Sequence, residues 1–303
     1  MFLGIDAGGS ATRWAVSDAA GQIVARGETA AMSGHLFDDA ARARMVLAAA
    51  ELALAVGMRI DGVTAGITGL SAEAPLADLA RAILVTALGV PAEKILIRDD
   101  LWIAYHGTFR PGAGHVVYAG SGSIGMHLRA DGTVVRVGGR GMLIDDGGSA
   151  FAIARAALNH VWRARDADPG FLSPLAQALD TATGGHNWDT VRAHVYGGGR
   201  NAMAQLARAV AAADDPVARN ILRAAGADLA RLALALVARE GSRPVALLGR
   251  AARLHPAIAA GFRRAAPGLD MRLVTIDAAA AAARLAADAD AVQAAYLDTS
   301  EGR

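Results

Sequence analysis

Two similar strand–turn–strand patterns constrain the fold of this chain more than any other feature. The first pattern turns at Gly8-Gly9-Ser10, and the second turns at the glycine- and serine-rich residues 120–123. The strands expected around these turns are residues 2–6, 13–18 and 22–27 in the first pattern, and residues 115–119, 125–129 and 133–137 in the second. Short apolar runs joined by glycine turns are typical of β-hairpins and meanders. Because the same pattern occurs twice, the sequence predicts two related units.

Helical and strand-like segments alternate along the chain. In the first unit we expect helices at 38–57 and 75–88 and strands at 62–67 and 94–98. The segments expected in the second unit are helices at 149–165, 200–213 and 216–240, a strand at 245–248 and a helix from about 278. Alternating strands and helices predict an α/β fold. The turn-rich residues 110–114 predict a boundary between a first domain at 1–110 and a second domain at 111–285.

The composition favours a small-molecule partner. The chain has 30 Lys and Arg against 29 Asp and Glu, so we expect no nucleic-acid partner and no membrane partner. The hydrophobic fraction of 53% comes mainly from alanine spread among charged residues, which argues against a membrane span. The first residues do not resemble a signal peptide, and this predicts a cytoplasmic location. The absence of cysteine excludes disulfides, thiol catalysis and iron–sulfur clusters.

The first glycine turn has the residues of a phosphate-binding loop. Glycine lets several backbone N–H groups approach one anion, so Gly8 and Gly9 are candidate phosphate ligands. The hydroxyls of Ser10 and Thr12 would add donors to the same anion. Asp6, at the end of the preceding strand, could hold a hydrated Mg²⁺ beside the phosphate oxygens. The alternative is that the two glycines only form a tight hairpin.

The second turn, residues 120–125, matches the G-x-G-x-x-G pattern of dinucleotide-binding proteins. In those proteins the glycines begin a helix, whereas residues 126–135 are typical of a strand, a turn and a second strand. A NAD-binding oxidoreductase is therefore a less favoured alternative. The sequence also contains no Walker A motif. The candidate phosphate ligands of this turn are Ser121, Gly122 and Ser123.

With one such turn at the head of each unit, the chain resembles the sugar kinase, Hsp70 and actin superfamily. Within it, the chain resembles the BadF/BadG/BcrA/BcrD ATPase family, which includes N-acetylglucosamine kinase and bacterial glucosamine kinases. The strings that carry the resemblance are residues 4–10, 119–123, 137–141 and 144–150. The resemblance implies a two-lobed actin/hexokinase/Hsp70-like (ribonuclease H-like) fold with the nucleotide in the interlobe cleft. It also implies that a C-terminal helix at about 286–303 packs back on the first lobe.

Asp100 is the candidate catalytic base. It follows the strand expected at 94–98 and precedes an apolar helical segment, so its carboxylate would project from a strand end. The family has its catalytic aspartate at this point, where it also faces the sugar. The alternative is helix capping by Asp99 or Asp100, with one residue as the cap and the other as the base.

The resemblance further implies a sugar-binding segment. Asp146 would accept hydrogen bonds from sugar hydroxyls. The alternative for this residue is helix capping together with Ser149. The other sugar contacts that the resemblance implies are Gly139, Arg140, Gly141 and Ala150.

Three further positions bear on the ligands. Ile124 and Gly34 stand where animal N-acetylglucosamine kinases have asparagines, which puts recognition of an acetamido group in question. Arg140 makes its segment more similar to that of the bacterial glucosamine kinases. Gly249 follows the strand at 245–248 and resembles the family's third nucleotide motif, where glycine leaves room for the purine and ribose. A plain strand-to-helix turn is the alternative for Gly249.

These features together predict an ATP-dependent amino-sugar kinase that phosphorylates glucosamine or N-acetylglucosamine at the 6-hydroxyl. ATP and Mg²⁺ are the expected cofactors, and a homodimer is left open. The main alternative is a non-catalytic sensor of sugar and ATP with the same fold, which the retention of Asp6, Asp100 and Asp146 disfavours. An ATPase that activates a dehydratase would need cysteines for its iron–sulfur cluster, and this chain has none.

Overall fold

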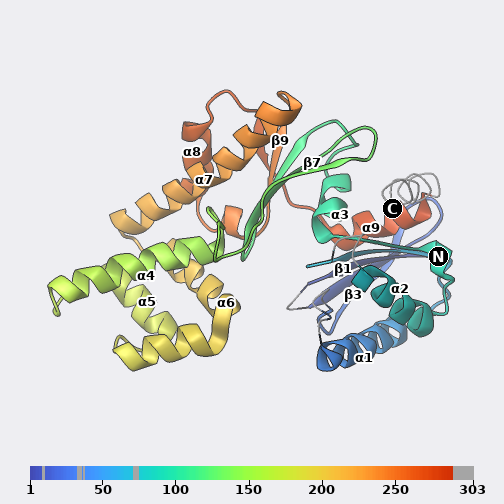
Figure 1. Ribbon diagram of the computed structural model, residues 1–303, viewed down its shortest axis with the longest axis horizontal. Helices are drawn as coiled ribbons and strands as arrows, with labels where there is room; N and C mark the ends of the chain where they lie inside the picture. Colours follow the sequence, from blue (N-terminus) through green and yellow to red (C-terminus); the bar gives the residue numbers. More distant parts are fainter. Residues whose placement is uncertain (9–10, 33–35, 37, 71–74, 289–303) are drawn as a thin grey trace. The chain divides into compact units, whose positions relative to one another are not determined.

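The computed structural model describes residues 1–8, 11–32, 36, 38–70 and 75–288 (Figure 1). The chain divides into two compact units. Unit 1 consists of Met1–Pro111, Leu128–Thr133 and Ile276–Arg303, and unit 2 consists of Gly112–His127 and Val134–Thr275. The helix expected at about 286–303 lies mostly outside the described residues.

Unit 1 is built on a mixed sheet of five strands in its described part, in the order β3-β2-β1-β4-β5. The strands are β1 (Phe2–Ala7), β2 (Thr12–Ser17), β3 (Ile23–Thr29), β4 (Gly62–Ile67) and β5 (Ile95–Arg98). The first three form the predicted meander, whereas β4 and β5 run parallel to β1. Because the carboxyl ends of β1, β4 and β5 meet at one edge, the residues that follow these strands are brought together there.

Helices cover both faces of the unit 1 sheet. They are α1 (Asp39–Val56), α2 (Pro75–Leu88), α3 (Asp100–His106) and α9 (Ala278–Ala287), with a 3₁₀ turn η1 at Ala92–Lys94. In Figure 1, α1 and α2 lie on one side of the sheet and α3 and α9 on the other. Leu3 and Ile5 of β1 are buried in the cluster that contains α1 and α2. The opposite face of β1, which carries Asp6, is therefore on the side of α3 and α9.

Unit 2 has a second five-stranded mixed sheet among its described residues, in the order β10-β9-β6-β7-β8. The strands are β6 (His115–Ala119), β7 (Ser123–Leu128), β8 (Val134–Gly138), β9 (Val245–Leu248) and β10 (Met271–Leu273). β6 pairs antiparallel with β7 and parallel with β9. The G-x-G-x-x-G match therefore lies in a β-hairpin and does not begin a helix.

Unit 2 is mostly helical beyond this sheet. Its helices are α4 (Ala150–Ala167), α5 (Pro174–Thr183), α6 (Trp188–Ala212), α7 (Pro216–Glu240) and α8 (Pro256–Ala265), with a 3₁₀ turn η2 at Ala251–Arg253. Its core includes Val117 of β6, Leu229 of α7 and Phe262 of α8. α6 begins earlier than the predicted helix at 200–213, because its first half precedes a kink at Gly199.

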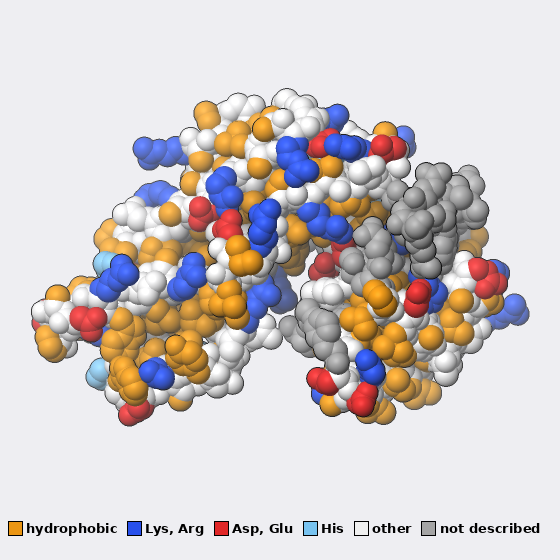
Figure 2. All heavy atoms as spheres, viewed as in Figure 1, with side chains coloured by type: hydrophobic (Ala, Val, Ile, Leu, Met, Phe, Trp, Pro, Cys, Tyr) orange, Lys and Arg blue, Asp and Glu red, His pale blue; other side chains and the backbone are white. Residues whose placement is uncertain are grey.

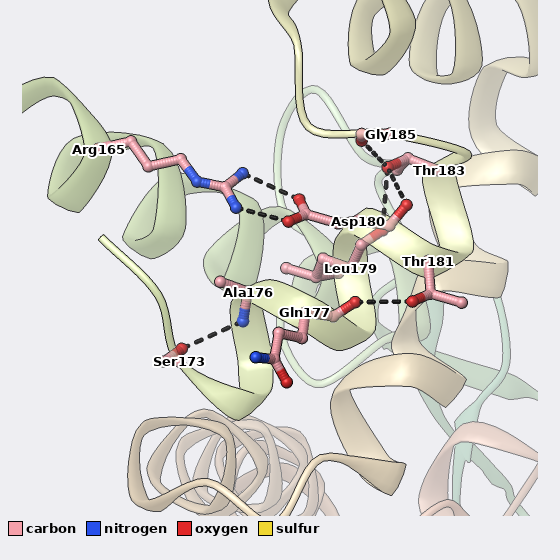
Figure 3. Close-up of polar contacts among 9 residues, drawn as sticks. All are labelled: Arg165, Ser173, Ala176, Gln177, Leu179, Asp180, Thr181, Thr183 and Gly185. Carbon is pink, nitrogen blue, oxygen red and sulfur yellow. Dashed lines mark hydrogen bonds and ion pairs between the residues drawn. The ribbon is translucent and has the colours of Figure 1, made fainter. Parts of the chain in front are cut away.

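A charged pair joins two of these helices (Figure 3). The Arg165 guanidinium of α4 donates to both carboxylate oxygens of Asp180 on α5, at 2.9 and 2.6 Å. Both side chains are largely buried, which favours a strong bidentate ion pair. Ser173 caps the start of α5 by accepting from the Ala176 backbone N–H, and Thr183 Oγ1 closes its end by donating to the Gly185 carbonyl at 2.8 Å. The α4–α5 hairpin is thus fixed by polar as well as apolar contacts.

The surface is mixed in character (Figure 2). On the face drawn there, positive and negative side chains are interspersed, and apolar side chains gather over α4–α6. The exposed large apolar residues of that region include Leu172, Trp188 and Tyr196. Among the described helices, none is both long and apolar enough to span a bilayer. The mixed α/β class predicted from the sequence is confirmed by the two sheets and their helices.

Candidate functional site

Asp6 lies near the end of β1, opposite Arg13 of β2 in the antiparallel register. Its carboxylate is 3.9 Å from the Arg13 guanidinium, which also reaches Glu28 at 3.4 Å. The pKa of Asp6 is raised to about 6, first by burial and then by the negative charge of Asp100, while Arg13 opposes the rise. Asp6 is thus a carboxylate whose charge is not fully compensated by the protein.

Asp100 is the first residue of α3 and follows β5 directly. Its Oδ2 accepts a 2.7 Å hydrogen bond from the Thr68 hydroxyl, and Thr68 follows the parallel strand β4. Burial raises the pKa of Asp100, and the Thr68 hydrogen bond opposes that rise. Asp99 caps α3, since its side chain accepts from the Trp102 backbone N–H at 2.7 Å. The cap therefore belongs to Asp99, and the Asp100 carboxylate faces Thr68 and the charge of Asp6.

The first glycine turn closes the β1–β2 hairpin. The Gly8 backbone N–H donates to the Ala11 carbonyl at 3.1 Å. Thr12 is fully buried, and its hydroxyl oxygen accepts a 2.9 Å hydrogen bond from the Met32 backbone N–H. Gly9 and Ser10 lie outside the described residues. The Gly8 hydrogen bond thus closes the hairpin, and the Thr12 hydroxyl ties β2 to the segment after β3. The phosphate contacts of both residues stay a prediction.

An open pocket of about 380 Å³ lies beside Asp6 in the described part of unit 1. Its wall includes Arg13 and Trp14 of β2 and Arg26 of β3. Asp277, which precedes α9, forms an ion pair of 3.4 Å with Arg26 at this wall. The pocket presents both a carboxylate and guanidinium groups, so it can accept a polar ligand or hydrated ion next to Asp6.

The second glycine turn is held by backbone and serine hydrogen bonds within unit 2. The Gly120 N–H donates to the Gly122 carbonyl at 2.8 Å, and the Ala150 N–H donates to the Gly120 carbonyl at 2.9 Å. The buried Ser123 hydroxyl donates to the Gly147 carbonyl at 2.6 Å. Ser121 is exposed at the tip of the turn. The turn thus abuts the start of α4, where Ala150 is the first residue.

Asp146 is a buried carboxylate next to this turn, with 5% of the residue exposed. Its Oδ1 accepts from the Ser123 N–H at 3.4 Å, and its Oδ2 accepts from the Arg200 guanidinium at 3.2 Å. Burial raises the pKa of Asp146, and the positive charge of Arg200 opposes the rise. Ser149 caps α4 by accepting from the Ala152 N–H at 3.1 Å. The capping role is therefore filled by the Ser149 side chain, and the Asp146 carboxylate faces the glycine turn.

The segment expected to contact the sugar forms a tight loop. Gly139 and Arg140 are exposed, and the Gly139 N–H donates to the Ser123 carbonyl at 3.1 Å. Gly141 accepts from the Asp145 N–H at 3.0 Å. Ile124 packs against Gly139, so this apolar side chain borders the loop. Gly34, the other position relevant to an acetamido group, lies outside the described residues.

The loop is also fixed by charge. The Asp145 carboxylate forms a 2.7 Å ion pair with Arg231 of α7. A hydrogen bond from the Gly147 backbone N–H, together with Arg231, lowers the pKa of Asp145. Asp145 is therefore an ionised anchor of the loop, whereas burial raises the pKa of its neighbour Asp146.

Gly249 follows β9 and lies against the end of β6. Its φ is +94°, and a Cβ at this position would overlap the Ala119 carbonyl oxygen. Close packing of the two strand ends thus explains why glycine is needed here, and a contact with purine or ribose stays a prediction.

Two residues of these sites were not predicted from the sequence. Thr68 follows the strand at 62–67, and its place at the carboxyl end of a parallel strand is the signal that could have identified it. Arg200 has no such local signal, because its contact with Asp146 depends on the kinked path of α6.

Asp6 is the residue best suited to hold a divalent metal. Among the described residues, no group of three or more His, Asp or Glu side chains could hold an ion by itself. Mg²⁺ commonly binds through one or two carboxylates, with water and phosphate oxygens as its other ligands. Burial and then the negative charge of Asp100 raise the pKa of Asp6, which fits a cation that would offset the two negative charges.

Comparisons with known proteins give the family and the fold of the chain. The model of the BadF/BadG/BcrA/BcrD ATPase family matches residues 3–260. A proposed N-acetylglucosamine kinase from Chromobacterium violaceum is 25% identical over 94% of this chain and 98% of its own, with a TM-score of 0.73. No curated protein matches the sequence significantly.

Two more distant structures share the fold. A proposed N-acetylglucosamine kinase from Porphyromonas gingivalis is 16% identical over 96% of this chain and 100% of its own, with a TM-score of 0.72. A ROK family glucokinase from Streptomyces griseus, solved with glucose and AMPPNP, is 17% identical over 98% of each chain, with a TM-score of 0.56. These likenesses confirm the two-lobed, actin-like α/β fold of sugar kinases.

Proposed function

Because the chain belongs to the BadF/BadG/BcrA/BcrD ATPase family, we propose that it is an ATP-dependent kinase that phosphorylates an amino sugar. The observation that carries the proposal is the Asp100 carboxylate, which lies at the carboxyl ends of the parallel strands of unit 1, near Asp6 and next to Thr68. Glucosamine and N-acetylglucosamine are the proposed acceptors, with the 6-hydroxyl as the reacting group. The likeness to the Chromobacterium violaceum protein supports this choice of substrate class.

In the proposed reaction, Asp100 accepts the proton of the sugar hydroxyl. The hydroxyl oxygen then forms a bond to the γ-phosphorus of ATP, the bond to the β–γ bridging oxygen breaks, and ADP leaves. Burial raises the pKa of Asp100 towards the range in which a general base works well at neutral pH. The Thr68 hydroxyl fixes the orientation of the carboxylate.

Asp6 is the proposed Mg²⁺ ligand. The metal, when bound, would neutralise charge on the phosphate oxygens. Gly8, Gly9, Ser10 and Thr12 are the proposed phosphate contacts of unit 1, and Ser121, Gly122 and Ser123 those of unit 2, with Gly249 beside the ribose. A cation held by Asp6 would offset the negative charge of that carboxylate, which favours the ionised form of Asp100.

Sugar recognition is assigned to Asp146 with the loop at 139–141 and with Ala150. A carboxylate can accept hydrogen bonds from two neighbouring hydroxyls, and Asp146 lies buried where such bonds would be strong. The apolar Ile124 beside Gly139 offers no hydrogen bond to an acetamido group. This favours glucosamine over N-acetylglucosamine.

The test is ADP release with Mg-ATP and a panel of glucosamine, N-acetylglucosamine, N-acetylmannosamine and glucose. One amino sugar should give strong turnover, and Asp100→Asn should lower it by about two to four orders of magnitude while ATP binding is kept. Asp99→Asn is the matched control, because it removes a neighbouring charge and asparagine caps helices as well as aspartate. Measurable ATP binding without turnover on any sugar would instead favour a sensor.

A further inference from the structure

The Arg200 guanidinium lies directly against the second glycine turn. A Cβ built on Gly122 would overlap its Nη2 atom and would come within 3.1 Å of the Asp146 carboxylate. The turn, the buried carboxylate and the guanidinium therefore form one cluster, and the absence of a side chain at Gly122 makes room for it. Both residues and the turn belong to unit 2, so the cluster is described within one compact body.

The contact between Arg200 and Asp146 is loose. Its length is 3.2 Å, and the other contact of the carboxylate, with the Ser123 N–H, is 3.4 Å. Strong charge-assisted bonds of this type are about 2.7–2.9 Å long. The Arg200 side chain is 43% exposed, and among the described residues Asp146 is the partner that the structure gives to its guanidinium. A guanidinium has five N–H donors, so donors remain for an added anion.

The backbone before Arg200 contains a break in α6. Gly199 has φ +59° and ψ −150° inside the helix, and it is the last residue of the run Gly197-Gly198-Gly199. These angles are accessible to glycine and unfavourable for other residues. Without the break, α6 would continue straight and carry Arg200 along a different path. The kink at Gly199 thus places the Arg200 guanidinium at the second glycine turn.

We propose that Arg200 is a phosphate-binding residue of the second turn, whose guanidinium exchanges the Asp146 carboxylate for a phosphate oxygen of the bound nucleotide. This inference rests on the proposed ATP-dependent function. A phosphate offers more charge and more acceptor oxygens than the carboxylate, in a geometry that suits the planar guanidinium. Asp146 loses its cation in the exchange, which frees its Oδ2 atom to accept from a sugar hydroxyl.

The test measures nucleotide binding to the full chain by calorimetry, with Mg-AMPPNP, Mg-ADP and adenosine. Arg200→Gln should weaken Mg-AMPPNP roughly ten- to a hundredfold and leave adenosine unchanged. Arg200→Lys should recover part of the loss, because it keeps the charge without the planar geometry. Arg208→Gln, which removes an exposed arginine from the same helix, is the matched control and should bind like the native chain.

A double variant separates a phosphate contact from simple neutralisation of Asp146. If Arg200 acts on phosphate, Arg200→Gln should remain weak for Mg-AMPPNP when Asp146→Asn is also present. Recovery of native affinity in the double variant would overturn the proposal, because Arg200 would then only balance the buried charge. Unfolding curves of each variant identify any loss of affinity that comes from misfolding. Arg200→Lys keeps the positive charge and so serves as the conservative variant.

The outcome also separates this inference from the proposed kinase activity. If no sugar is phosphorylated but Arg200→Gln still loses affinity for Mg-AMPPNP, the kinase proposal fails and the role of Arg200 stands. If an amino sugar is turned over and Arg200→Gln binds Mg-AMPPNP as tightly as the native chain, the role of Arg200 is wrong and the kinase proposal stands.

Discussion

The Thr68 hydroxyl donates a 2.7 Å hydrogen bond to Oδ2 of Asp100. The two residues follow the neighbouring parallel strands β4 and β5, so the register of the sheet brings them together. The bond favours the ionised carboxylate and opposes the burial that raises the pKa of Asp100. A general base must be ionised to accept a proton, so Thr68 extends the proposed activity to lower pH.

Thr68→Val should therefore shift the pH profile. Loss of the hydroxyl raises the pKa of Asp100 further, and the acid limb of kcat/KM should move to higher pH by about one unit or more. Thr68→Ser should restore the native profile. The matched control is Thr64→Val on β4, the strand that Thr68 follows, because the buried Thr64 hydroxyl has no hydrogen-bond partner in the described structure. An unchanged acid limb in Thr68→Val would show that the hydroxyl does not tune the base.

Asp6→Asn should stabilise the protein in the absence of Mg²⁺. The folded pKa of Asp6 is raised from 3.8 to about 6, so ionised Asp6 opposes folding once the pH exceeds both values. Below pH 3.8 both states are protonated and the effect vanishes. The shift corresponds to about 2–3 kcal/mol at neutral pH, as an upper bound. Urea unfolding with EDTA at pH 7.5 measures the full stability difference between the variant and the native chain, and the same measurement at pH 3.5 checks that the difference disappears.

Arg13→Gln should change the stability of the metal-free protein in the opposite direction to Asp6→Asn. Arg13 lowers the pKa of Asp6, so its removal leaves the carboxylate less compensated and should destabilise the metal-free protein at pH 7.5. Added Mg²⁺ should stabilise the native chain more than it stabilises the Asp6→Asn variant. Equal stability of Asp6→Asn and the native chain at both pH values would contradict the raised pKa.

The elements that the sequence predicts well are those fixed by local patterns. The two hairpins follow from apolar alternation around glycine turns, and the position of Asp100 follows from a strand that ends just before a helix. Local pattern could not decide between Asp99 and Asp100 as the cap, because both residue types suit it. The backbone angles at the start of α3 decide for Asp99.

The features that the sequence did not predict depend on contacts between distant segments. The buried hydroxyl of Thr12 is held by the Met32 N–H, which a search for phosphate ligands does not anticipate. Arg200 contacts Asp146, 54 positions away in the sequence, because of a kink in α6 that the helical pattern does not reveal. Such pairings are set by tertiary packing, on which single-sequence periodicity carries no information.

Gly249 and Gly141 provide a matched test of how two tight loops of unit 2 are packed. Both have positive φ, +94° and +87°, so alanine at either position is strained by about 1–2 kcal/mol. They differ in their surroundings: a Cβ at Gly249 would overlap the Ala119 carbonyl, whereas a Cβ at Gly141 would meet nothing within 4 Å. The backbone strain is thus shared, and the steric clash is specific to Gly249.

Gly249→Ala should therefore cost about 3 kcal/mol or more of unfolding free energy, because β9 must move away from β6 in addition to the strain. Gly141→Ala should lose only the unfolding free energy that corresponds to the backbone strain. Urea unfolding of the two variants measures the difference, and calorimetry with Mg-ADP shows whether the displaced strand end also weakens nucleotide binding. Equal losses in the two variants would mean that unit 2 accommodates the added methyl, and the close contact between Gly249 and Ala119 would not be what requires glycine there.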